Sequence, residues 1–241
     1  MSLSYQIFGE TAILISWENK ISKAVHAEVM QMERFISEMY QDVIIECVPS
    51  YQSLTVYLHS EINPTQFIAK VEKNFPKYAT IKTATEKNII TVPVCYDEPF
   101  SLDLERVAAK ASLTMKEVVE RHTQPLYPVY FIGFLPGFPY LGGLDEKLIT
   151  PRLESPRASV PSGSVGIGGA QTGIYTNASP GGWNLIGRSP LMFFSIHETP
   201  PSLLRAGDFV KFRAISIKEY DRMESLLKNG LYQIEREVIY D

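Results

Sequence analysis

The 241-residue sequence is poor in the residues that build covalent or metal-bound frameworks. It has two cysteines, Cys47 and Cys95, and neither belongs to a CxxC pair, which argues against a disulfide framework and a zinc site. Its four histidines, at positions 26, 59, 122 and 197, lack the spacing of metal ligands. We therefore expect no metal ion, and we expect both cysteines to be buried free thiols.

The chain also lacks long apolar runs and a strong excess of either charge. No segment approaches the roughly 18 apolar residues of a membrane-spanning helix, and residues 1–17 lack the pattern of a signal peptide. The formal net charge of −4 gives no reason to expect a nucleic acid or an anionic membrane as partner. We therefore expect a soluble, cytoplasmic protein with no nucleic-acid and no membrane partner.

Apolar residues make up 45% of the chain, enough for a real core, and the length suits one large domain or two modest ones. In residues 1–90, helical patterns alternate with strand-like runs in the order strand, strand, helix, strand, strand, helix, strand. This order predicts a small α+β sandwich with helices on one face of a mixed sheet. The helices are expected at 21–39 and from Asn63-Pro64 onward, and the strands at 5–8, 11–17, 43–48, 54–58 and 89–95.

Glycine and short strand-like runs dominate residues 91–241. Twelve of the 15 glycines lie between Gly133 and Gly187, where they separate these runs. Many short strands punctuated by glycine and proline predict a β-barrel or sandwich rather than a doubly wound sheet. The strands are expected at 129–134, 164–167, 173–175, 191–196 and 209–215, with a terminal helix at 217–227.

Between these two regions, residues 101–122 predict two short helices. Ser101 is expected to cap the first, and Thr114 with Glu117 is expected to form a capping box at the start of the second. Helices of this length could form a DNA-binding helix-turn-helix. Their charges cancel, however, and the second contains two glutamates that phosphate would repel, so DNA binding is disfavoured.

Arginine is the only basic residue type in the middle of the glycine-rich region. Residues 152–188 contain Arg152, Arg157 and Arg188 against one acid, Glu154. Arginines on such a scaffold suit bidentate binding of a carboxylate or phosphate, and the glycines of 163–169 would let backbone amides approach an anion. The alternative is that the glycines form tight barrel turns and that the arginines bond backbone carbonyls.

Three familiar catalytic motifs are missing from this region. No Gly-Lys-Ser/Thr phosphate loop is present, because no lysine lies between residues 148 and 208. The order SGSVG at 162–166 does not fit the Gly-x-Ser-x-Gly nucleophile elbow. Gly166 and Gly168 are not followed by the rest of a dinucleotide fingerprint or by a helical pattern.

One histidine and a set of aromatic residues are further candidates. His122 ends the second short helix, where it could act as a general base or as a cation at the helix terminus. Around residues 133–143, glycine and proline interrupt the chain too often for one continuous strand. The aromatics there could form barrel core or meet a ligand or partner; they are Phe131, Phe134, Phe138 and Tyr140.

Several blocks of this region occur in the order typical of a known family. They are 133–143 (GFLPGFPYLGG), 160–169 (VPSGSVGIGG), 171–175 (QTGIY), 180–183 (PGGW), 186–188 (IGR) and 203–208 (LLRAGD), with 46–54 (ECVPSYQSL) nearer the start. Together they resemble the B-type subunit of 5-oxoprolinase, a family that includes a sporulation-kinase inhibitor and resembles the first subunit of allophanate hydrolase-like proteins. The resemblance covers nearly the whole chain.

The resemblance implies a cyclophilin-like β-barrel at 91–241 behind a smaller α+β domain at 1–90. It also implies an ATP-dependent enzyme that opens the lactam ring of 5-oxoproline to give glutamate, together with A and C subunits. Such a site must stabilise phosphate charge and hold a carboxylate. The expected catalytic residues are His122, Arg157 and Arg188, and the expected substrate-binding residues are Arg152, Ser164, Gln171, Thr172 and Tyr175.

Two other functions follow from the resemblance and the fold. The family includes inhibitors of a sporulation sensor histidine kinase. If this chain is such an inhibitor, the kinase could bind its aromatic residues Phe131, Phe134, Phe138 and Tyr140. Peptidyl-prolyl isomerase activity is suggested only by the expected cyclophilin-like fold, and a fold by itself does not determine function. Because the chain lacks a nucleotide loop and a strong nucleophile, we expect it to be inactive alone, with ATP used by the assembled complex.

Overall fold

The computed structural model describes residues 3–18, 22–80 and 86–240. They belong to two compact units, Met1–Thr85 and Glu86–Asp241. Within the described residues, no helix combines the length and the apolarity needed to cross a bilayer. Both cysteines are free thiols, and Cys95 is buried as expected whereas Cys47 is only half-buried.

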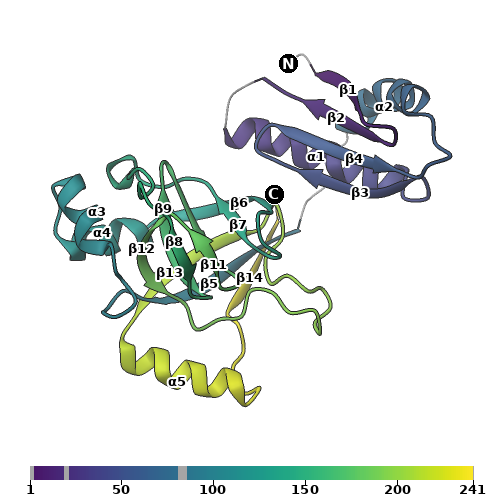
Figure 1. The fold of residues 1–241 in the computed structure, drawn as a ribbon. Coiled ribbons are helices and arrows are strands. Elements are labelled where there is room, and N and C mark those ends of the chain that lie inside the picture. Colours follow the sequence, from purple (N-terminus) through teal and green to yellow (C-terminus); the bar gives the residue numbers. More distant parts are fainter. Residues whose placement is uncertain (1–2, 19–21, 81–85, 241) are drawn as a thin grey trace. The chain divides into compact units, whose positions relative to one another are not determined.

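The first unit is a two-layer α+β sandwich (Figure 1). All strand pairs of its sheet are antiparallel, in the order β1-β2-β4-β3. Alternate residues of β4, Leu54, Val56 and Leu58, are fully buried against both helices, so one face of the sheet holds the core. The elements are β1 (Ser4–Phe8), β2 (Ala12–Ser16), α1 (Lys23–Met39), β3 (Ile44–Pro49), β4 (Ser53–Leu58) and α2 (Pro64–Ala79).

The second helix begins where its sequence predicted. The Asn63 side chain accepts a hydrogen bond from the Gln66 amide, and Pro64 occupies the first helical turn, where its missing amide proton costs nothing. The prediction of a mixed sheet was wrong, because the expected fifth strand belongs to the second unit. That strand, β5 (Glu86–Cys95), pairs in parallel with β13 (Phe209–Ile215). Its last four residues are all buried, which shows that this end of the strand is covered on both faces, unlike a strand of a one-sided sheet.

Seven strands of the second unit form a closed barrel in the order β12-β9-β10-β7-β6-β13-β5. Pairing of Arg188 with Cys95 joins β12 to β5 and closes it, while β14 pairs with the first half of β5. The α+β fold with a β-barrel predicted from the sequence is therefore confirmed. The remaining strands are β6 (Leu126–Ile132), β7 (Pro139–Leu141), β9 (Ser164–Gly168), β10 (Gln171–Ile174), β12 (Asn184–Arg188) and β14 (Arg236–Tyr240), with β8 (Arg157–Val160) and β11 (Ser179–Gly181) forming a separate pair.

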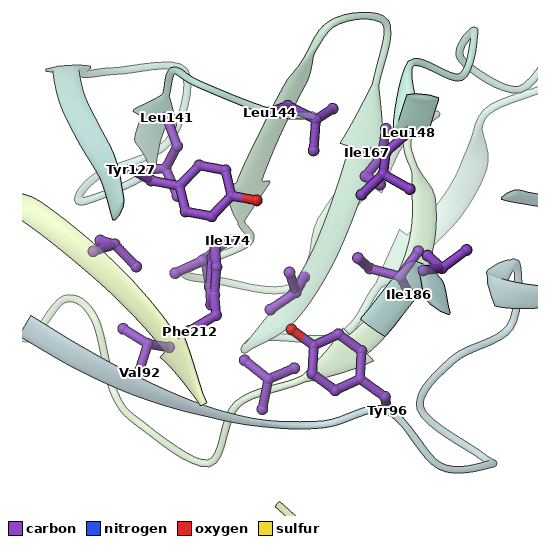
Figure 2. Close-up of a cluster of buried hydrophobic side chains, with 14 of the residues drawn as sticks. Val92, Tyr96, Tyr127, Leu141, Leu144, Leu148, Ile167, Ile174, Ile186 and Phe212 are labelled. Carbon is purple, nitrogen blue, oxygen red and sulfur yellow. The ribbon is translucent and has the colours of Figure 1, made fainter. Parts of the chain in front are cut away.

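Aliphatic and aromatic side chains fill the barrel. Figure 2 shows Tyr96 and Tyr127 among aliphatic residues such as Ile174 and Ile186, with both hydroxyl groups directed toward the interior. Each large apolar side chain buried here contributes roughly 1.5–3 kcal/mol to folding. The two hydroxyl groups need polar partners inside this core.

Helices pack around this barrel and complete the second unit. They are α3 (Leu104–Ala111), α4 (Met115–Thr123) and α5 (Ile217–Lys228), with a short 3-10 turn, η1 (Glu146–Leu148). The capping box of Thr114 and Glu117 is confirmed. The prediction that Ser101 caps α3 was wrong, because Asp103 occupies that position. The predicted strand at 191–196 was also wrong; the described chain forms only an isolated bridge from Phe194 to Ser202 there.

Candidate functional site

A buried aromatic group lies beneath the glycine-rich region. We call Phe138, Tyr175 and Trp183, with Val160 and Leu185, the Trp183 cluster. The Phe138 ring lies edge-on to both the Trp183 ring at 5.7 Å and the Tyr175 ring at 5.6 Å. Such edge-to-face pairs add about 0.5–1.5 kcal/mol each to the burial of the rings.

The glycines of the region make room for these rings. A Cβ atom at Gly168 would lie 2.5 Å from Nε1 of Trp183, and one at Gly173 would lie 3.0 Å from its Cζ3. A Cβ atom at Gly181 would overlap the Tyr175 hydroxyl. Close packing, rather than approach to an anion, therefore explains glycine at these three positions.

The backbone amides of residues 163–169 lie in a segment that is hydrogen-bonded within the barrel. The Gly163 amide donates to the Tyr175 carbonyl at 2.7 Å, and the Gly169 amide donates to the Thr150 carbonyl at 2.8 Å. Between them β9 is paired on one side with β10 and on the other with β12. Of the two alternatives that the sequence left open for these glycines, the structure therefore favours tight barrel turns over an anion site, and the segment does not fit a nucleotide phosphate.

Two of the three arginines meet at Trp183. The Arg152 guanidinium lies over the Trp183 ring at 5.8 Å, within cation–π range. Arg157 donates to the Trp183 carbonyl at 3.4 Å and forms an ion pair with Asp103 at 2.8 Å. Burial raises the pKa of Tyr175, and the nearby positive charges of Arg152 and Arg157 partly offset this effect.

Arg152 is exposed but its backbone is held firmly. The preceding carbonyl, of Pro151, accepts from the Asn184 side chain at 2.9 Å, and the following amide, of Leu153, donates to the Gly182 carbonyl at 2.7 Å. Among the described residues, no carboxylate forms an ion pair with Arg152. Arg152 therefore presents, from a fixed backbone position, a guanidinium that no carboxylate of the described residues pairs with.

Arg188 has different neighbours from the other two arginines. Its Nε donates to the Ser162 carbonyl at 2.8 Å, and its guanidinium lies 5.7 Å from the Phe100 ring. Phe100 in turn packs against Tyr220 of α5, with ring centroids 4.5 Å apart. Arg188 is thus bonded to the backbone and placed beside α5.

His122 is fully buried at the end of α4, with both ring nitrogens bonded. Its Nε2 lies 2.9 Å from Oγ1 of Thr172, and its Nδ1 lies 2.7 Å from the Tyr96 hydroxyl. The Thr172 hydroxyl uses its one proton to donate to the Gly166 carbonyl, so it must accept from the histidine. The tautomer is thereby assigned, with the proton on Nε2 and the Tyr96 hydroxyl donating to Nδ1.

Burial lowers the pKa of His122 from 6.5 to about 3. The imidazole is therefore neutral at pH 7, and it lies stacked on Phe212 with centroids 4.5 Å apart. A general acid–base role for His122 stays a prediction. In the structure His122 supports β10, because its Nε2 is bonded to the side chain of Thr172 in that strand.

The other predicted substrate-binding residues lie on adjoining strands. Ser164 is buried in β9 opposite Arg188, Thr172 is buried in β10, and Gln171 is half-buried at the start of β10. Tyr175 belongs to the Trp183 cluster. The structure brings Ser164, Gln171 and Thr172 onto two neighbouring strands, and their role in binding substrate stays a prediction.

The four predicted partner-binding aromatics differ in exposure. Phe138 is 2% exposed, whereas Phe134 is 65% exposed and has a φ of 65°. Phe131 stacks on Tyr140 at 4.2 Å, and both are half-buried. Phe134 is the member of this set most available to a partner.

Asp103 is a residue of this region that sequence reasoning missed as a site residue. One carboxylate oxygen binds Arg157, and the other accepts from the Leu185 amide at 2.7 Å. The Asp103 amide donates to the Leu185 carbonyl at 2.8 Å, which joins α3 to β12. The sequence signal for Asp103 was an aspartate at the start of a helix, but its hydrogen-bond partners are 54 and 82 residues away along the chain.

In the described residues, no group of three or more histidine, cysteine, aspartate or glutamate side chains is arranged to hold a metal ion.

Comparison with known proteins gives a consistent set of relatives. The family model described as carboxyltransferase domain, subdomain C and D, matches residues 3–204. The B-type subunit of 5-oxoprolinase from Bacillus subtilis (strain 168) is 42% identical over 232 residues, covering 91% of this chain and 97% of that protein. The protein of the same name from Escherichia coli O157:H7 is 39% identical, covering 86% and 93%. The crystal structure of TTHA0988 superposes with a TM-score of 0.74 at 29% identity over 85% of this chain, which spans 40% of that longer chain.

Proposed function

We propose that this chain, which belongs to the family of 5-oxoprolinase B-type subunits, is part of an ATP-dependent enzyme that hydrolyses 5-oxo-L-proline to L-glutamate. The observation that supports this function is the match to two such subunits along nearly the full length of both chains. The A and C subunits would be its partners in the complex. The chain by itself would be inactive.

The chemistry explains why several subunits are needed. A lactam is a poor electrophile, and ATP supplies activation by phosphorylating the carbonyl oxygen. Overall, one water adds across the ring C–N bond and a second across the terminal phosphoanhydride bond. Because the glycine-rich segment of this chain does not fit a phosphate, we assign nucleotide binding to a partner subunit.

Arg152 is the residue of this chain that we assign to the substrate. It is exposed over Trp183, has no carboxylate partner in the described part of the chain, and is held by bonds on both sides of its backbone. A guanidinium in such a place suits the carboxylate of 5-oxoproline. Arg157 and Arg188 are already bonded within the protein, so we assign them to shaping the surface around that carboxylate.

The partner subunit would cover this surface beside Phe134. The loop that presents Phe134 is closed by a hydrogen bond from the Gly133 amide to the Phe138 carbonyl at 3.0 Å. An exposed aromatic ring on a constrained loop is a typical interface anchor. Inhibition of a sensor histidine kinase through the same aromatics stays a prediction.

Reconstitution tests this function directly. The chain is co-expressed with homologues of the A and C subunits, and 5-oxoproline-dependent ATP hydrolysis is measured with each of the three omitted in turn. We expect turnover only when all three are present. Full activity without this chain would contradict the proposal, and so would activity of this chain alone.

A further inference from the structure

The second unit contains a cavity of about 600 Å³ that no predicted site residue lines. Its walls are the segment 192–203, the first residues of β5 and β14, and the end of α5. Several of its residues, including Arg205 and Arg236, lie beyond the part of the chain that the carboxyltransferase-domain model matches. The cavity therefore calls for an explanation separate from that of the Trp183 cluster.

Hydrogen bonds hold the walls of this cavity in place. The Asp208 carboxylate accepts from the Asn88 side chain at 3.1 Å and from the Arg205 amide at 2.9 Å. Across the cavity, the Leu203 amide donates to the Phe193 carbonyl at 2.9 Å. Both the strand wall and the 192–203 segment are thus fixed without a ligand, as expected of a preformed pocket.

Strand pairing directs charged residues of β5 and β14 to one side. Arg236 lies opposite Ile90 in the antiparallel pair, and opposite residues share a face. Glu86 and Asn88 share that face with Ile90, because alternate residues of a strand point the same way. Glu86 and Arg236 consequently line the same cavity but lie four residues apart along the ladder, roughly 13 Å.

Charged residues of both signs line the cavity. Arg205 and Arg236 carry positive charges, and Glu86, Glu198 and Asp208 carry negative ones. None of these five side chains forms an ion pair within the described residues, and the Asp208 carboxylate is already bonded to Asn88 and to the Arg205 amide. The cavity also has an apolar part, formed by Phe193, Leu227 and Ile234, which pack with the barrel core.

We infer that this cavity binds a short zwitterionic peptide with apolar side chains. The arginines would hold its carboxylate, the glutamates its ammonium group, and the apolar part its side chains. The cavity volume lies in the range of sites for drug-sized ligands, which suits a dipeptide. The presence of both guanidinium and carboxylate groups favours a zwitterion over a simple anion or cation.

Titration calorimetry of the full chain with L-leucyl-L-leucine tests this inference. We expect a dissociation constant of about 1 mM or lower. N-acetyl-leucyl-leucine and leucyl-leucine amide each lack one charge, so each should bind at least about tenfold more weakly. Absence of binding at about 10 mM, or equal binding of all three compounds, would overturn the inference.

Two variants assign the charges to the residues. Arg236→Gln should weaken leucyl-leucine about tenfold without weakening the amide further, because the lost partner is the carboxylate. Glu198→Gln should also weaken leucyl-leucine about tenfold, because the lost partner is the ammonium group. Binding of N-acetyl-leucyl-leucine, which has no ammonium group, should not weaken further. Arg222→Gln, exposed on α5 and outside the cavity, is the matched control. An equal loss in the Arg222 control would count against the site.

Discussion

His122 should make the second unit sensitive to acid. The native protein keeps this histidine neutral down to about pH 3, because the imidazole is buried and bonded on both sides. In the unfolded chain the same group takes up a proton below about pH 6.5. Unfolding therefore becomes more favourable as the pH falls from 6.5 toward 3, and this contribution is absent above 6.5.

The size of the effect follows from the two pKa values. Between them, each pH unit lowers the free energy of unfolding by about 1.4 kcal/mol, which gives a ceiling of about 5 kcal/mol near pH 3. At about pH 4.5 the loss is about 3 kcal/mol. His122→Gln cannot titrate, so it should lack this slope even though losing the ring lowers its stability at neutral pH.

Urea unfolding measured from about pH 7 to about pH 4.5 provides the assay. Trp183 lies in the second unit and Trp17 in the first, so a Trp17→Phe background makes fluorescence report on the barrel unit alone. His197→Gln is the matched control, because His197 is exposed. If the His122 variant loses stability with falling pH as steeply as the parent, the assignment of a buried neutral imidazole is refuted.

Three further outcomes follow from the site. In the assembled enzyme, Arg152→Ala should raise KM for 5-oxoproline at least about tenfold, whereas Arg222→Ala on exposed α5 should leave it unchanged; equal kinetics of the two variants would remove Arg152 from the substrate. Gly168→Ala should lower the free energy of unfolding by roughly 1–3 kcal/mol, since its methyl group overlaps Trp183. Gly133→Ala, whose nearest neighbours are 3.7 Å away, should be nearly neutral, and comparable urea midpoints for both would contradict the packing argument. Phe134→Ser should weaken co-purification with the partner subunits while leaving the thermal midpoint of the isolated chain within about 2 °C; undiminished co-purification would exclude this ring from the interface.

Features set by local chemistry were readable from the sequence. The capping box at Thr114 and the Asn63-Pro64 helix start depend on hydrogen bonds three residues apart, and both were predicted. The strand at 209–215 was predicted with its observed bounds, because four of its seven residues, Phe209, Val210, Phe212 and Ile215, are aromatic or β-branched. The ordered blocks of the glycine-rich region also identified the family.

Features that depend on distant partners were decided by the tertiary structure alone. Strand β5 has an ordinary strand sequence, and its pairing with residues 209–215 and with β12 places it in the barrel. The sequence left open whether the glycines approach an anion or allow tight packing. At Gly168, Gly173 and Gly181 the structure shows tight packing, because a Cβ atom there would lie too close to the rings of Trp183 or Tyr175. The convergence of Arg152 and Arg157 on Trp183, without Arg188, likewise depends on the barrel closing, because composition and spacing do not say which side chains share a surface.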